Sequence, residues 1–366
     1  MFMIKYQIIL RLTTLIIFIT NLVKIDLLAQ TKFQNTISGR VSDAGTGEPL
    51  FNVNVFLANT TRGDATDKDG YYVIENIPPG AYDLIFSMMG YELEIVQIQF
   101  IRTKSIKYNM KLQPQVIKGK EIQVEATIPK DWRNNLEKFT KEFLGSTDNA
   151  KKCKLLNPEV LDFQIDKENN RFIATTDSIL IVENRSLGYR MHIILEAFRI
   201  SKDSLIYSIY PRYEQLTPQD ENESKKWMEN RHETYQGSFR HFLSALARGV
   251  LEHEYFILFT LEGKYIRSDQ LKIMPDTSLA LKWLFLDQPL EVIYKGLSRT
   301  GKGKYIAEWA GHFPSSCIHP KKGYAQIDTL GNVYTKFAFI HSGYWFDERI
   351  ADMLPFDFMP DYKDKN

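Results

Sequence analysis

The chain has 366 residues, of which 44% are hydrophobic and 13% aromatic. That composition supplies a sizeable core and excludes disorder over most of the chain, and the length favours two domains. The 46 Lys and Arg residues balance 45 Asp and Glu residues. A chain with so little net charge has no broad field that would attract nucleic acid or anionic lipid, so neither is expected as a partner.

Residues 1–30 have the order of a secretory signal peptide. Lys5 and Arg11 give a positive start, residues 12–23 are apolar, and small and polar residues follow. The apolar run is shorter than the ~20 residues that span a bilayer. We therefore expect cleavage beside Ala29 or Gln30, rather than an uncleaved anchor, and no transmembrane span after cleavage.

The chain has two cysteines, Cys153 and Cys317. In an oxidising compartment a disulfide between them would close a long loop, which the chain-entropy treatment values at roughly 5 kcal/mol. Two free buried thiols are the equally weighted alternative, because sequence does not show whether the two Cα atoms approach each other.

Residues 31–113 predict a β-sandwich. Hydrophobic and polar residues alternate over several short runs that are separated by turn-forming segments such as Pro78-Pro79-Gly80, and no helical period occurs. The residues that we expect on the buried faces of the first two strands are Ile37, Gly39 and Val41, and then Phe51, Val53, Val55 and Leu57.

The same segment carries a set of short motifs: I-x-G-x-V, G-E-P-L, N-V-x-V, T-x-x-D-G, I-P-P-G-x-Y and a late G-Y. Together, over residues 36–112, they resemble the carboxypeptidase-regulatory-like domain. The resemblance implies an all-β, transthyretin-like, Ig-like sandwich of seven strands. It also implies a non-catalytic module, since the family is named after a domain that lies beside a zinc peptidase.

Asp67, Asp69 and Gly70 have the spacing of part of a calcium loop. With Gly70 at the sixth position of an EF-hand, the first position is Ala65 and the twelfth is Asn76, so two anchoring ligands are missing. The segment instead predicts a hairpin turn.

Residues 114–130 predict a linker, with one further strand at Glu121–Ala126, and residues 131–366 predict an α+β domain. Apolar residues at helical spacing indicate a helix that ends at Gly145; they are Trp132, Leu136, Phe139 and Phe143. Strands follow, with a turn or bulge at Gly188. Two helices divided at Gly237-Ser238, with Ser238 as N-cap, precede a strand near residues 255–261. This region resembles the C-terminal region of envelope proteins that carry the same N-terminal domain and have no assigned activity.

Motifs for catalysis and cofactors are absent. No His is followed by an acid three residues later, and H-E-x-x-H, G-x-S-x-G, the Walker loop and G-x-G-x-x-G do not occur. We therefore expect no cofactor and no metal. His312, Cys317 and His319 could form half of a zinc site, but they lack a second Cys/His pair.

The densest polar and aromatic segment contains Arg231, Tyr235, Arg240 and His241, which could line a groove for a carboxylate, phosphate or sugar. The alternative is a helix pair whose arginines meet buried acids of the sheet, such as Glu183 or Glu196.

We expect an exported, non-catalytic envelope protein, periplasmic or associated with the outer membrane or cell surface. Its sandwich would be a spacer or docking module, and its C-terminal domain would bind an envelope protein or a glycan. The second hypothesis is a hydrolase with its site in the C-terminal domain near Arg231 to His241, a segment that includes Ser238 and His241. A deep pocket that joins these two side chains to a carboxylate would favour the hydrolase, whereas a closed, packed face would count against it.

Overall fold

The computed structural model describes residues 35–100, 104–115, 130–202, 204–276, 281–296, 315–358 and 360. The predicted signal peptide with its cleavage site, the predicted strand at Glu121–Ala126, and His312 lie outside these ranges. Among the described residues, no helix has both the length and the apolar character that a membrane span needs.

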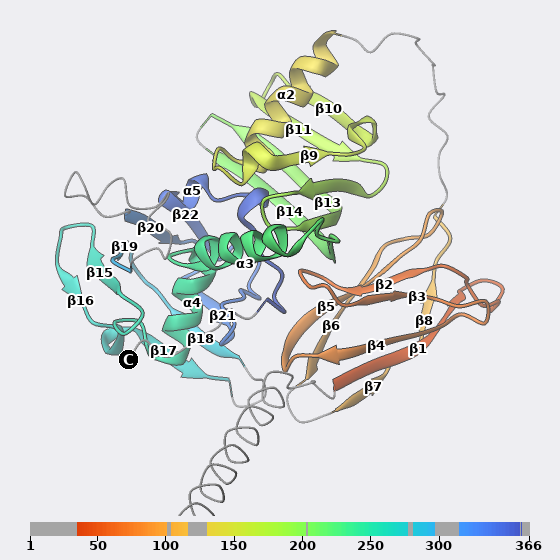
Figure 1. The fold of residues 1–366 in the computed structure, drawn as a ribbon, viewed down its shortest axis with the longest axis horizontal. Coiled ribbons are helices and arrows are strands. Elements are labelled where there is room, and N and C mark those ends of the chain that lie inside the picture. Colours follow the sequence, from red (N-terminus) through yellow and green to blue (C-terminus); the bar gives the residue numbers. More distant parts are fainter. Residues whose placement is uncertain are drawn as a thin grey trace, which may run out of the picture.

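The N-terminal part is a β-sandwich of two sheets (Figure 1). In one sheet β1 pairs with β4 on one side and, in parallel, with β7 and β8 in succession on the other, so β7 and β8 form one interrupted strand. The eight strands thus occupy seven positions. The second sheet has the order β3-β2-β5-β6. The bounds are β1 Asn35–Asp43, β2 Asn54–Leu57, β3 Gly63–Ala65, β4 Tyr71–Ile77, β5 Gly80–Ser87, β6 Glu94–Phe100, β7 Ser105–Lys107 and β8 Met110–Leu112.

The residues predicted to face inward in β1 and β2 are buried with one exception, and Phe56, which is outside that predicted set, is buried as well. Ile37, Val53 and Leu57 are fully buried, but the side chain of Phe51 is 57% exposed. Phe51 lies in a turn before β2, where Asn52 has a φ of 62°. The left-handed residue interrupts the extended backbone, so the period-two prediction for Phe51 is wrong.

The segment at Asp67 is a turn, as predicted, but it is not a hairpin turn, because it joins β3 of one sheet to β4 of the other. The Oδ1 atom of Asp67 accepts hydrogen bonds from the N–H groups of Asp69 (2.9 Å) and Tyr71 (2.8 Å). Gly70 has a φ of 81°, and a Cβ there would lie 2.5 Å from the carbonyl oxygen of Val41. The Asp and Gly residues therefore serve the backbone of the turn.

A six-stranded sheet with one covering helix begins the C-terminal part. Its order is β10-β11-β13-β12-β9, with β14 paired along β13. Helix α2 has the predicted buried face, and Phe139 and Phe143 pack on Phe198 of β13. The bounds are α2 Lys130–Leu144, β9 Cys153–Leu155, β10 Leu161–Asp166, β11 Arg171–Thr176, β12 Leu180–Asn184, β13 Tyr189–Ser201 and β14 Ser204–Gln215.

Two helices and two smaller sheets follow. The sheets have the orders β16-β15-β19-β20-β22 and β17-β18-β21, and helix α4 lies in the hydrophobic core that both share. The bounds are α3 Glu221–Tyr235, α4 Phe239–Arg248, β15 Phe256–Thr260, β16 Tyr265–Ile266, β17 Lys272–Pro275, β18 Lys282–Phe285, β19 Leu290–Tyr294, β20 Ser315–Pro320, β21 Tyr324–Ile327, β22 Phe339–Gly343 and α5 Tyr344–Asp347. The predicted mixed α and β character of the C-terminal part is confirmed.

The sandwich is packed against the β13–β14 hairpin. Phe56 and Ile85, on the outer face of the sheet that contains β2 and β5, are buried with Tyr210 and partly buried Ile194. The N–H of Asn59 donates to the carbonyl of Pro211 over 2.7 Å. The outer face of a sandwich sheet is usually polar, so this apolar patch explains why Phe56 interrupts the alternation of β2.

Candidate functional site

Helix α3 is fastened to the turn between β12 and β13. Three of its side chains donate to three successive carbonyl groups of that turn. The pairs are Trp227 Nε1 with Arg185 O (2.9 Å), Asn230 Nδ2 with Ser186 O (2.7 Å) and Arg231 Nε with Leu187 O (2.7 Å). The turn carbonyls would otherwise lack partners in the protein interior, so these residues position the helix.

Arg231 belongs to this attachment. Its side chain is buried, and the guanidinium carbon lies 4.0 Å from the centre of the Tyr189 ring. Burial lowers the pKa of Arg231 from its usual value. The guanidinium is thus directed at carbonyls and an aromatic face inside the protein, where a soluble anion does not reach it.

Tyr235 and His241 face one another across the break between α3 and α4. Their ring centres are 4.9 Å apart, and Phe256 and Tyr294 enclose the imidazole on its other sides. The Nδ1 atom of His241 accepts from the N–H of Gly237 (3.0 Å), so Nε2 carries the proton and faces Glu254 at 3.4 Å. Both rings are buried.

Ser238 is the N-cap of α4, as predicted. Its hydroxyl accepts from the N–H of His241 (3.1 Å) and donates to the carbonyl of Tyr235 (2.7 Å), so it is directed away from the imidazole nitrogens. A cavity of about 10 Å³ beside Gly237 and Trp345 holds no more than one water. The Tyr235 and His241 rings are buried, and the Ser238 hydroxyl is not bonded to the His241 imidazole. The geometry therefore counts against a hydrolytic site here.

Arg240 organises the last described segment of the chain. All the hydrogen bonds that its guanidinium donates to the described residues go to carbonyl oxygens. They are Leu330 O (3.0 Å), Leu354 O (3.4 Å), Pro355 O (2.8 Å), Phe356 O (2.9 Å) and Phe358 O (3.2 Å). The planar fork of arginine suits several acceptors at once. Arg240 therefore fixes residues 354–358, which in turn contact the sandwich.

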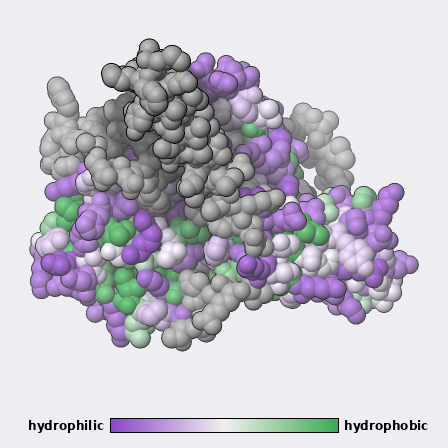
Figure 2. Space-filling view, turned by 60° about the horizontal axis from the view of Figure 1, so that its bottom comes forward, coloured by the Kyte–Doolittle hydropathy of each residue, from purple (hydrophilic) through white to green (hydrophobic). Residues whose placement is uncertain are grey.

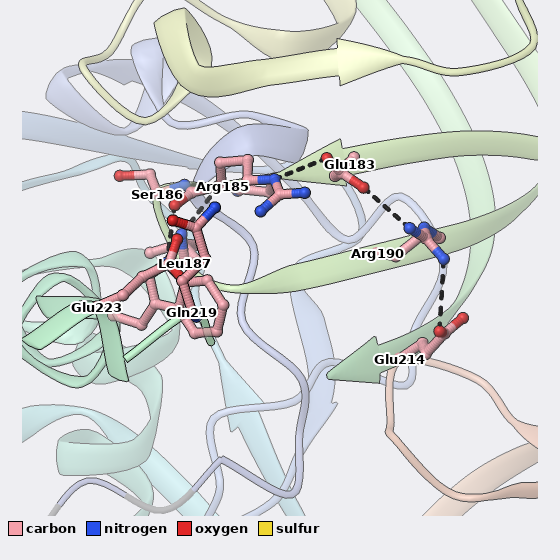
Figure 3. A network of polar contacts seen from close by, with 10 residues as sticks. Glu183, Arg185, Ser186, Leu187, Arg190, Glu214, Gln219 and Glu223 are labelled. Atoms are coloured by element: carbon pink, nitrogen blue, oxygen red, sulfur yellow. Dashed lines mark hydrogen bonds and ion pairs between the residues drawn. The ribbon is translucent and has the colours of Figure 1, made fainter. Parts of the chain in front are cut away.

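The alternative prediction was that Arg231 and Arg240 meet buried acids such as Glu183 or Glu196. It is wrong, because both arginines bind carbonyl groups instead. Glu183 pairs with Arg190 (3.0 Å) and Arg185 (2.8 Å), which hold the pKa of its carboxyl below the usual value. Figure 3 shows Arg190 bridging Glu183 and Glu214 (3.5 Å) across β12, β13 and β14. These residues lie opposite one another in register, so cross-strand pairing selects their partners.

Both cysteines are free thiols in the structure. Cys153 is in β9 of the six-stranded sheet and Cys317 is in β20 of the five-stranded sheet. Burial, with a contribution from Asp352, raises the pKa of Cys153 to about 12. Of the two alternatives, the structure has the free thiols rather than the disulfide.

No group of three or more His, Cys, Asp and Glu side chains able to hold a metal occurs among the described residues. Cys317 and His319 of the predicted half-site lie in β20, and His319 Nε2 is 3.5 Å from the Ser342 hydroxyl. The third member, His312, is outside the described ranges.

The three-stranded sheet presents an aromatic outer face. Strand register places Phe285 of β18 between Lys272 and Tyr324, and Trp283 between Met274 and Gln326. The residues that alternate with them along the strands point to the other side of the sheet, into the core; they are Leu284, Ala325 and Ile327. We refer to Lys272, Met274, Trp283, Phe285, Tyr324 and Gln326 as the aromatic face.

The aromatic face is held in shape from its rim. Asp276 Oδ2 accepts from Trp283 Nε1 (3.0 Å) and from Gln326 Nε2 (3.2 Å). The Lys272 ammonium lies 4.8 Å from the centre of the Phe285 ring, and the Trp283 and Tyr324 ring centres are 5.7 Å apart. Tyr324 and Met274 are 43% and 47% exposed. Trp283 and Phe285 are half-buried, so the face is fixed in shape and only partly open to solvent.

The space-filling view shows hydrophobic residues in patches among hydrophilic ones on the side where the C-terminal sheets lie (Figure 2). Exposed apolar patches commonly mark binding surfaces. The sequence carried a partial signal for the aromatic face, since Trp283 and Phe285 are two positions apart and so lie on the same side of a strand. The partners that complete it come from β17 and β21, and β21 begins about forty residues later, so the pattern of one strand did not show the assembled surface.

The family model of the CarboxypepD_reg-like domain matches residues 37–124. These residues are a CarboxypepD_reg-like domain. The match includes the whole sandwich from β1 residue Ile37 onward, so the predicted resemblance is confirmed for the N-terminal part. It ends before α2, and no match to this chain was found among curated proteins.

Solved structures share only distant similarity with the chain. An N-terminal interface mutant of the type II cohesin–X-dockerin complex from Acetivibrio cellulolyticus is 20% identical over 21% of this chain and 52% of its own, with a TM-score of 0.18. A candidate carbohydrate-binding protein from Bacteroides uniformis is 11% identical over 50% and 79%, with a TM-score of 0.19.

A candidate membrane-associated protein of unknown function from Bacteroides fragilis is 12% identical over 50% of this chain and 82% of its own, with a TM-score of 0.19. The chain spans about half the length of the cohesin-containing structure. TM-scores this low do not show that the chain shares its overall arrangement with these structures. The comparisons with them therefore assign no site.

Proposed function

We propose that this protein is an exported, non-catalytic binding or scaffold protein of the bacterial envelope, with its binding surface in the C-terminal part. The observation that carries the proposal is the aromatic face of β17, β18 and β21. Tyr324 and Met274 are exposed on it, Trp283 and Phe285 are half-buried, and Asp276 holds Trp283 in place.

The position of the CarboxypepD_reg-like domain supports a scaffold role. Phe56 and Ile85 are buried against Tyr210, and Asp357 is bonded to Thr61, so the sandwich is held against the C-terminal part. We infer that the domain is a fixed brace rather than a flexible spacer. A brace of this kind presents the aromatic face in a defined orientation relative to the sandwich.

The hydrolase hypothesis receives no support from the geometry around Ser238 and His241. The hydroxyl and the imidazole have other partners, and the cavity beside Gly237 fits a single water. The function that the described residues favour is therefore binding, with an envelope protein or glycan as partner.

The test is a pull-down from envelope fractions of the source organism with immobilised mature protein. The informative variant is Trp283→Ala combined with Tyr324→Ala, and the matched control is Tyr265→Ala, an exposed aromatic on β16. We expect the double variant to lose partners that the wild type and the control retain. Identical recovery by all three proteins would contradict the proposal that this face binds.

A further inference from the structure

The chemistry of the aromatic face identifies a class of ligand, an inference that rests on the proposed function. The rings of Trp283 and Tyr324 are tilted by 60° to one another and form a shallow surface, with Phe285 beside Tyr324 in register. The C–H groups on one side of a sugar ring pack well on the electron-rich face of an aromatic ring. Hydroxyl groups at the sugar edge then need donors and acceptors nearby.

Polar groups of that kind border the rings. Gln326 continues the row of Met274 and Trp283, Asp276 lies at the end of β17, and Tyr324 brings a hydroxyl. Rings for stacking, with amide, carboxylate and hydroxyl groups at their edge, match the two kinds of surface on a saccharide. A purely apolar partner would leave these polar groups without compensation for lost water.

Charge on the face indicates a neutral ligand. Lys272 lies over the Phe285 ring, and Asp276 is bonded to Trp283 and Gln326, so both charges have partners within the face. The two charges are also of opposite sign. An anionic polymer would therefore gain little from the face itself.

Size separates a glycan from a folded protein. Each strand contributes four residues, which at ~3.3 Å per residue and ~4.8 Å between strands gives a face of roughly 10 by 10 Å. A stable protein interface buries about 800 Å² on each partner, several times this area. A few sugar rings of a chain fit the available surface.

We propose that the aromatic face is a binding site for a neutral glycan, in which Trp283 and Tyr324 stack against sugar rings and Gln326 and Asp276 bind hydroxyl groups. This assigns the site and the ligand class together. Tyr324 is the more exposed ring and Trp283 the more rigidly held, since its Nε1 is bonded to Asp276.

The experiment is isothermal titration of the mature protein with cellohexaose, maltohexaose, xylohexaose, mannohexaose and N-acetylchitohexaose, and with polygalacturonate as the anionic probe. We expect at least one neutral oligosaccharide to bind. Trp283→Ala and Tyr324→Ala should each weaken that binding roughly tenfold or more. Tyr324→Phe, which keeps the ring and removes only the hydroxyl, should weaken binding less than Tyr324→Ala does, and the Tyr265→Ala control should bind as the wild type does. A thermal melt of each variant verifies folding.

Three results would overturn the glycan site: no neutral probe binds, Tyr324→Ala binds as tightly as the wild type, or polygalacturonate is the preferred ligand. If the pull-down depends on Trp283 and Tyr324 while no saccharide binds, the binding function stands with a protein partner and the glycan inference fails. If neither experiment depends on these rings, both proposals fail.

Discussion

Asp357 and Thr61 are hydrogen-bonded although 296 positions separate them in the chain. The N–H of Thr61 donates to Asp357 Oδ1 over 3.0 Å, and the Thr61 hydroxyl donates to the other carboxylate oxygen. Arg62 Nε lies 3.2 Å from the same carboxylate, whose side chain is 5% exposed. One carboxylate near the C-terminal end thus caps the β2–β3 loop of the CarboxypepD_reg-like domain.

Replacing Asp357 should loosen the sandwich. Asp357→Ala leaves a backbone donor and a hydroxyl without their acceptor and the Arg62 guanidinium without its counter-charge, which we expect to cost about 1–3 kcal/mol. Hydrogen exchange should increase first at residues 59–62. Asp347→Ala, an exposed acid in α5, is the matched control. Unchanged exchange at the loop would mean that the apolar contact of Phe56 and Tyr210 holds the two parts by itself.

Arg240 should matter for stability rather than for ligand binding. Arg240→Lys replaces a five-donor fork with a single ammonium that cannot reach all of the carbonyls from Leu330 and residues 354–358. We expect a loss of about 2–3 kcal/mol in the free energy of unfolding, measured by urea titration. Arg267→Lys, in an exposed pair with Asp269, should change stability by less than about 1 kcal/mol. Equal effects would contradict the carbonyl-binding role.

Gly188 should tolerate no side chain. Its φ is 68°, and a Cβ would lie 2.3 Å from the Trp227 ring. Gly188→Ala should therefore cost the left-handed strain of about 1–2 kcal/mol and, in addition, about 1–3 kcal/mol from overpacking. Gly249→Ala is the control: Gly249 has a φ of 74° and open space around it, so this variant measures the left-handed backbone strain without overpacking. If thermal melts of the two alanine variants agree, the contact with Trp227 is not tight.

Stability should fall in mild acid because of His341. Burial lowers the pKa of His341 from 6.5 to about 4, and its ring centre is 3.9 Å from that of Phe239. Between these two pH values the unfolded chain binds the proton and the folded protein does not. The contribution of His341 to the free energy of unfolding is therefore complete above pH ~6.5 and decreases as the pH falls toward ~4, by about 3 kcal/mol in total.

The variant His341→Gln cannot titrate, so its unfolding free energy should depend less on pH over the same window. Urea titrations at several pH values measure the two slopes, and a comparison at pH ~8, above the window, separates any change in packing. The same slope in both proteins would show that His341 is not the group responsible.

Local features were predictable from the sequence because short segments determine them. The buried face of α2 follows from the spacing of Phe139 and Phe143, the start of α4 from Ser238, and the turn, although it is not a hairpin, from Asp67 and Gly70. Phe51 is the instructive exception. Its alternation with Val53 was correct as a pattern, but the left-handed Asn52 between them turned the chain.

The partners of polar side chains were not predictable in the same way. The sequence showed that Arg231 and Arg240 lie in a dense polar segment, and it suggested acids as their partners. The structure gives them carbonyl groups from a turn at residues 187–188 and from residues 354–358. A carbonyl group is present at every position, so no residue type marks the one that an arginine will meet.

By itself the sequence determined the sandwich, its turns, the helix faces and the absence of familiar catalytic motifs, because hydrophobic periodicity and turn chemistry act over a few residues. Only the tertiary structure decided that the Ser238 hydroxyl bonds to backbone groups rather than to the His241 imidazole, that the sandwich is held through Asp357, and that Trp283 and Tyr324 share one face of a sheet. Each of these depends on side chains brought together from distant segments, where packing and strand register choose the neighbours.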